Sequence, residues 1–92
     1  MRVVWDPRKA MANLRKHGIS LSDAEGAIFD PMGLTREDED SQGERRFVTI
    51  ARDHLDRVVV VVHSHRGEVT RLISARRATR KERLQYAKTV RF

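Results

Sequence analysis

The sequence contains no cysteine and few aromatic residues. The lack of cysteine excludes disulfide bonds and thiolate metal sites, and it fits a reducing, cytoplasmic location. One Trp, one Tyr and three Phe are a thin basis for a surface that binds nucleic acid by base stacking alone. The N-terminus is charged within a few residues, so we expect neither a signal peptide nor a transmembrane span, and no membrane partner.

The sequence also lacks the short motifs that identify common classes of enzyme. There is no glycine-rich phosphate loop, no nucleophile elbow and no His-Glu-x-x-His zinc motif. His63 and His65 would share one face of a strand, but a metal site needs further ligands, and the nearest carboxylate in sequence is Glu68. We therefore expect neither a cofactor nor a bound metal.

The chain is short and strongly basic, and its charge is uneven. Its 92 residues, with a net charge of +6, are expected to form a single domain, 1–92. Residues 57–92 hold ten Lys or Arg against only Glu68 and Glu82, whereas residues 37–56 are net acidic. A local concentration of cations predicts binding to a polyanion, with nucleic acid as the first candidate. A solvated basic surface without a ligand is the alternative.

Capping residues and hydrophobic periodicity predict an α+β domain. Three segments have helix caps and apolar residues at helical spacing: 7–17, a second from Ser20 or Ser22 to Phe29, and a third from the capping box Thr79–Glu82 to about Val90. Four segments are rich in β-branched residues and are expected to be strands: 2–5, 46–51, 57–63 and 69–75. Residues 32–36 are expected to form one further short strand. The order is therefore β-α-α-β-β-β-β-α, a small antiparallel sheet with helices packed against it.

The apolar residues also predict what is buried. The run of five valines, 58–62, is typical of a strand covered on both faces. In the first helix, Ala10, Met11 and Leu14 are spaced to face the core. In the last helix, the corresponding set is Leu84, Ala87 and Val90, with Tyr86 nearby.

Arginines gather where the last strand is expected to end and the last helix to begin. They are Arg76, Arg77, Arg80 and Arg83, and the last two lie on one helical face. A helix N-terminus presents free N–H groups and a positive dipole end, both of which bind phosphate. The alternative is that these arginines pair with the acidic residues 37–40 or with Glu82.

Three further residues are candidates beside this cluster. Tyr86 is spaced to share the face of Arg83, where it either contacts a phosphate or a base, or packs as a half-buried residue. Lys16 and His17 end the first predicted helix, and they reach the cluster only if that helix ends beside it.

If the cluster is catalytic, metal-free RNA cleavage is the reaction that needs these residue types. The RNA 2′-hydroxyl is an internal nucleophile, so the protein has to orient it and remove its proton. The protein must also stabilise the charged phosphorane and protonate the leaving oxygen. Histidine or tyrosine moves protons, and arginine stabilises the charge.

Four motifs follow one another along the chain in a characteristic order. They are Trp5-Asp6-Pro7-x-Lys9, Asn13-x-x-Lys16-His17-Gly18-Ile19-Ser20, Glu44-Arg45-x-x-x-x-Ile50 and Ile73-Ser74-Ala75-Arg76-x-Ala78-Thr79-x-x-Glu82-Arg83-x-x-Tyr86. The sequence resembles the BrnT family, the ribonuclease toxins of type II BrnT/BrnA toxin–antitoxin systems in bacteria. The resemblance extends over nearly the whole chain.

The resemblance implies a RelE-like fold and an RNA-cleaving activity that inhibits translation and arrests growth. It implies neutralisation by a BrnA-like antitoxin with a ribbon-helix-helix DNA-binding part, so that operator DNA is bound only through the toxin–antitoxin complex. An acidic or amphipathic antitoxin segment would cover the same basic surface. A non-catalytic module that binds nucleic acid or a partner protein is the alternative function.

The resemblance also implies a set of site residues. Arg76, Arg80 and Arg83 are expected to bind phosphate and stabilise the transition state, and His17 or Tyr86 is expected to carry protons. Residues expected only to bind RNA or phosphate are Lys16 and Arg66, together with Arg77 from its place in the cluster.

Overall fold

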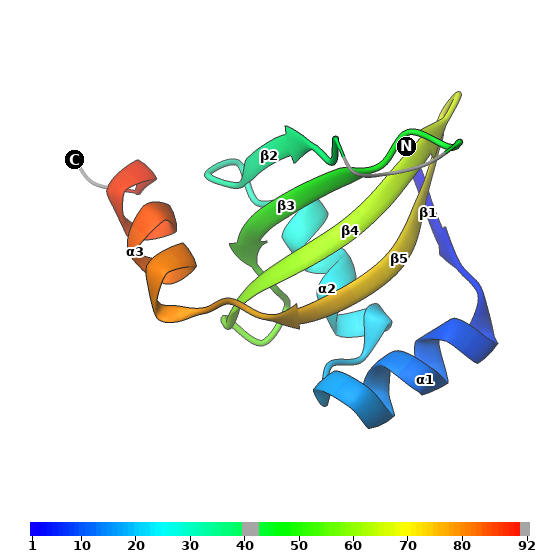
Figure 1. The fold of residues 1–92 in the computed structure, drawn as a ribbon, viewed down its shortest axis with the longest axis horizontal. Helices are drawn as coiled ribbons and strands as arrows, with labels where there is room; N and C mark the ends of the chain where they lie inside the picture. Colours follow the sequence, from blue (N-terminus) through cyan, green and yellow to red (C-terminus); the bar gives the residue numbers. More distant parts are fainter. Residues whose placement is uncertain (40–42, 91–92) are drawn as a thin grey trace.

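A computed structural model describes residues 1–39 and 43–90, which form a five-stranded sheet and three helices (Figure 1). The elements in chain order are Arg2–Trp5 (β1), Pro7–His17 (α1), Leu21–Ile28 (α2), Leu34–Glu37 (β2), Phe47–Arg52 (β3), Val58–Arg66 (β4), Val69–Arg77 (β5) and Arg80–Thr89 (α3). The predicted order and the α+β fold class are confirmed. None of the helices in this part of the chain has the length and apolar character needed to cross a membrane.

The sheet has the strand order β1-β5-β4-β3-β2. Strands β3, β4 and β5 form an antiparallel meander, in agreement with the predicted antiparallel sheet, and β2 extends it antiparallel to β3. The edge strand β1 instead runs parallel to β5, with Arg2 opposite Val69. A parallel pair needs a long crossover connection, and here the chain between the two strands contains both α1 and α2.

The β4–β5 hairpin is longer than predicted. The first strand was expected to end at residue 63, but β4 continues to Arg66 and β5 begins at Val69, directly opposite it. A two-residue connection preserves the antiparallel register up to the turn, and Gly67 supplies the positive φ of 59° that such a turn requires. The pairing shifts by one residue next to Val62, so that Ile73 forms a bulge in β5.

The two faces of the sheet are covered differently. In Figure 1, α2 lies behind the sheet, where its apolar residues form the larger core with alternate residues of β4 such as Val59 and Val61. The helix α3 packs only near one end of the other face, against Ile50 and Val60. The central valines of β4 are therefore buried from both sides, as predicted.

The orientation predicted for α1 is wrong for Met11 and Leu14, which are 58% and 50% exposed, whereas Ala10 packs against the core as predicted. The buried residue of this helix is Asn13, whose amide bonds to the backbone of β5. Hydrogen bonding to a strand edge, which apolar periodicity does not reveal, therefore sets the rotation of the helix.

The face predicted for α3 is also wrong. Leu84 is 54% exposed and Ala87 lies on the surface, whereas Tyr86 is buried at 3% exposure and only Val90 of the predicted set packs on the core. Tyr86 is favoured at the interface because its ring packs on Ile50 and Val60 while its hydroxyl finds a partner.

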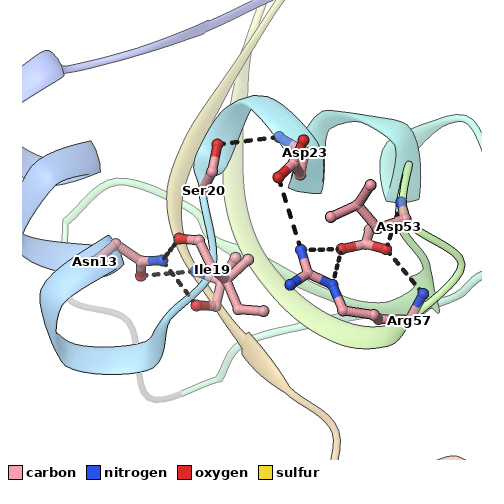
Figure 2. A network of polar contacts seen from close by, with 8 residues as sticks. Asn13, Ile19, Ser20, Asp23, Asp53 and Arg57 are labelled. Carbon is pink, nitrogen blue, oxygen red and sulfur yellow. Dashed lines mark hydrogen bonds and ion pairs between the residues drawn. The ribbon is translucent and has the colours of Figure 1, made fainter.

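The connection between β3 and β4 is fastened to α2 (Figure 2). Buried Asp53 accepts hydrogen bonds from the backbone and the Nε of Arg57, at 2.9 and 2.8 Å, and Arg57 also faces Asp23 of α2. The His54 N–H donates to the Asp23 carbonyl at 3.1 Å. Gly26 permits this approach, because a Cβ there would lie 2.9 Å from the His54 nitrogen.

Candidate functional site at the edge of β5 and the start of α3

Asn13 fixes α1 against the edge of β5. Strand β1 pairs with β5 only as far as Leu72, and α1 meets the edge beyond that point. The Asn13 side chain accepts a hydrogen bond from the Ala75 N–H at 3.0 Å and donates to the carbonyls of Ala75 and Ile19, both at 2.9 Å (Figure 2). The amide therefore takes the place of a neighbouring strand.

This anchor brings the end of α1 to β5. Lys16 and His17 line an open groove of about 230 Å³ together with Ile73 and Ser74 of β5. The helix ends at Gly18, which has a φ of 69° and donates its N–H to the Leu14 carbonyl. Lys16 and His17 therefore lie against the strand segment that leads into Arg76, although none of the four cluster arginines lines this groove.

Arg76 forms a bidentate ion pair with Glu82 of α3. Its Nη1 and Nη2 donate to the two carboxylate oxygens at 2.8 and 2.9 Å. Glu82 also accepts the Thr79 N–H at 2.8 Å, which completes the predicted capping box. The hydrogen bonds from Arg76 outweigh partial burial and hold the pKa of Glu82 down to about 2. For Arg76, pairing with Glu82 is what the structure shows, while 42% of its side chain stays exposed.

The other three arginines of the cluster differ in their contacts and in the direction of their side chains. Arg83 donates to the Ala78 carbonyl at 3.0 Å, and Arg80 is exposed in the first turn of α3. Arg77 lies opposite Val59 and Arg76 opposite Val60, so these two side chains point to opposite faces of the sheet. Neither Arg77 nor Arg80 has a side-chain ion pair within residues 1–39 and 43–90.

The predicted pairing of these arginines with residues 37–40 is not seen for the described residues. Glu37 pairs with Arg45 at 2.5 Å, while residue 40 lies outside the described part of the chain. Glu37 therefore pairs away from the arginine cluster.

Tyr86 is buried beneath the cluster. Its hydroxyl donates to Asp30 Oδ2 at 2.6 Å, and burial together with this hydrogen bond raises the pKa of Tyr86 to about 12. Asp30 also accepts N–H groups of Arg52 and Met32, both at 2.9 Å, and these bonds keep its pKa low despite partial burial. This geometry suits a hydroxyl that holds α3 on the sheet, whereas His17 lies on an open groove.

Arg66 does not join the cluster. It lies six residues along β4 from Val60, the partner of Arg76, which corresponds to about 20 Å. Arg66 instead lines a groove of about 420 Å³ at the hairpin end of the sheet, with Val4, Glu44, Ser64, Val69 and Arg71.

Sequence reasoning missed Arg71, which forms an ion pair with Glu44 across this groove. Side chains alternate along a strand, and the hairpin places Ser64 opposite Arg71. Arg66 and Arg71 therefore lie on one face. Extending the predicted strands through the short turn would have revealed this.

His63 and His65 form a hydrogen-bonded chain with two threonines. The contacts are Thr49 Oγ1 to His63 Nε2 at 2.7 Å, His63 Nδ1 to His65 Nε2 at 3.0 Å, and His65 Nδ1 to Thr70 Oγ1 at 2.9 Å. Burial, with the neighbouring His65, lowers the pKa of His63 to about 4. In the described ranges, no three His, Asp or Glu side chains are placed to share a metal ion.

Comparison with known proteins identifies relatives of this chain. The family model described as the ribonuclease toxin BrnT of type II toxin–antitoxin systems matches residues 5–82. The crystal structure of the Brucella abortus ribonuclease toxin BrnT has a TM-score of 0.67 and 23% sequence identity, covering 87% of this chain and 99% of that chain. This structural similarity shows a shared fold. No curated protein sequence matches significantly. Because the family model covers most of the chain, this protein belongs to the BrnT family of ribonuclease toxins of type II toxin–antitoxin systems.

Proposed function

We propose that this protein is a metal-independent endoribonuclease whose reaction centre lies where β5 leads into α3. The observation that carries the proposal is the ribonuclease-toxin family match over residues 5–82, which includes His17, Arg76 and Arg80. At this place an exposed arginine, a helix N-terminus and the groove of His17 adjoin the same strand.

The arginines are proposed to bind the scissile phosphate and to stabilise the negative charge that develops on it during the reaction. Glu82 holds the guanidinium of Arg76 from one side while part of the side chain stays exposed. Arg80 and Arg83 add positive charge in the first turns of α3, where backbone N–H groups also favour an anion. Because Arg76 is already oriented, little reorganisation is needed when phosphate binds.

His17 is the proposed proton carrier. In the reaction, the RNA 2′-oxygen loses its proton and attacks phosphorus, and the bond from phosphorus to the 5′-oxygen breaks. The products are a 2′,3′-cyclic phosphate and a 5′-hydroxyl, which receives a proton. Histidine exchanges protons near neutral pH, and His17 is only partly buried in its groove. Tyr86 is assigned a positioning role through Asp30.

Lys16, Arg77 and Arg66 are proposed to contact RNA phosphates outside the reaction centre. The partner proposed for the toxin is a BrnA-like antitoxin with a ribbon-helix-helix part, acting in the cytoplasm. Its acidic or amphipathic segment would cover the basic surface, and operator DNA would be bound only through the complex. Neutralisation then prevents the RNA cleavage that inhibits translation and growth.

The proposal is tested with purified, antitoxin-free protein and RNA in the presence of EDTA. Wild type should cleave, the Arg80→Ala, Arg83→Ala double variant should not, and Arg8→Ala should behave as wild type because Arg8 is an exposed cation at the start of α1. Thermal melts establish that each variant is folded. Cleavage that EDTA abolishes would refute metal independence, and binding without cleavage by the wild type would identify a non-catalytic module.

A further inference from the structure

The groove at the hairpin end of the sheet lies on the same face as Arg76. On β4, Val60 is opposite Arg76 and Ser64 is opposite Arg71. These two β4 residues are an even number of positions apart, so Arg71 and Arg76 point to the same side of the sheet. Their separation along the strand is about 13 Å, which a short single-stranded oligonucleotide can span. The helix α3 packs on this face near Ile50 and Val60, at the end that is near Arg76.

The lining of the groove combines charge with apolar surface. Arg66 and Arg71 supply two guanidinium groups, while Val4 and Val69 supply apolar side chains. Arg66 forms no side-chain ion pair with another described residue. Arginine binds phosphate oxygens in bidentate fashion and also stacks on bases, so this lining suits a nucleotide.

The ion pair of Arg71 with Glu44 places a carboxylate where a phosphate would bind. The two side chains are 46% and 32% exposed, so solvent screens the pair and it contributes little to stability. Such a pair can exchange its carboxylate for a phosphate oxygen at small cost.

We propose that this groove is a nucleotide subsite for the single-stranded RNA that flanks the scissile bond. In this subsite a backbone phosphate displaces Glu44 from Arg71, and Arg66 binds a neighbouring phosphate. The inference rests on the proposed ribonuclease function. It implies that the protein binds a stretch of RNA along the open face of the sheet, from the start of α3 to the hairpin.

The test uses fluorescence anisotropy with uncleavable 2′-O-methyl RNA. One oligonucleotide is long enough to span both regions, and the other is too short to reach the hairpin. Arg71→Ala should weaken binding of the long oligonucleotide roughly tenfold and leave the short one unchanged. For Arg71→Ala and the long oligonucleotide, the slope of log affinity against log salt concentration should be smaller in magnitude by about 0.7 for each phosphate that the variant no longer binds. Glu44→Gln should tighten long-oligonucleotide binding by roughly threefold, and Arg8→Ala should change neither.

Equal affinity of wild type, Arg71→Ala and Glu44→Gln for the long oligonucleotide would overturn the subsite. If Arg80→Ala, Arg83→Ala still abolishes cleavage in that case, the proposed ribonuclease function stands and only the subsite fails. A variant Arg71→Ala that binds RNA normally but loses affinity for an antitoxin would reassign the groove to a protein contact and would also overturn the proposal.

Discussion

Two arginines on the same face of β5 each pair with a glutamate, and the two pairs differ in how the glutamate is held. Glu82 is part of a capping box on α3, grips Arg76 with both oxygens and has a pKa of about 2. Glu44 lies in a connecting segment and meets Arg71 through one oxygen. The first pair therefore orients an arginine, whereas the second leaves an arginine ready to exchange its partner.

The largest effect is expected from removing the proposed proton carrier, His17, which lies in the groove next to Ile73 and Ser74 of the same strand as Arg76. His17→Gln should lower RNA cleavage by about 100-fold or more, because proton transfer contributes on that scale, while RNA binding persists.

Tyr86→Phe should change cleavage little and lower the free energy of unfolding by about 1 kcal/mol, since it loses one hydrogen bond to Asp30. Single-turnover cleavage and anisotropy follow the His17 variant, and denaturant unfolding follows the Tyr86 variant. A large rate loss in Tyr86→Phe alone would assign the proton to Tyr86.

The strand that both pairs share depends on Asn13. Asn13→Ala leaves the buried N–H and carbonyl of Ala75 without their partner, and it should lower the free energy of unfolding by about 3 kcal/mol. Denaturant unfolding measures the change. The exposed Arg15→Ala on the same helix is the control and should be nearly neutral. A near-neutral Asn13→Ala would mean that α1 is held by its apolar contacts.

Acid should loosen the hairpin end of the sheet. The pKa of His63 is about 4 in the folded protein against an ordinary value of 6.5, so the unfolded chain binds the proton first as pH falls. The contribution of neutral His63 is complete above about pH 6.5 and is lost towards pH 4, up to about 3 kcal/mol.

Unfolding free energies measured across this pH range test the prediction for His63. His63→Gln should flatten the profile, whereas the exposed His54→Gln should not. Hydrogen exchange of β4 amides would locate the loosening near Thr49 and His65, which bond to the His63 ring. An unchanged profile in His63→Gln would assign the pH dependence to other groups.

The smallest expected difference compares the two glutamates directly. Glu82→Gln loses a charged partner of Arg76 and weakens a helix cap, so it should lower the free energy of unfolding by about 1–2 kcal/mol. Glu44→Gln should stay within about 0.5 kcal/mol of wild type. The Glu82 effect should shrink as pH falls from about 4.5 towards 2, because the depressed pKa favours folding only while the carboxylate is charged. Equal effects of the two substitutions would remove the distinction between the pairs.

Capping residues and turn residues along the chain were sufficient to predict the order of the helices and strands. Asp6 and Pro7 start α1, Gly18 ends it, and the box of Thr79 and Glu82 starts α3, each within the reach of neighbouring residues. The placement of Lys16 and His17 beside β5 was predicted only as a condition, because it depends on the contact between Asn13 and Ala75, residues far apart in sequence.

What the sequence by itself determined is therefore the list of helices and strands, the density of positive charge and the family motifs. These depend on spacing within a few residues, where capping and side-chain alternation act. Only the tertiary structure decided that β1 runs parallel to β5, that Tyr86 is buried on Asp30, and that Lys16 and His17 lie against β5. The physical reason is that register, helix rotation and partner choice are set by contacts between distant segments, which the local pattern does not encode.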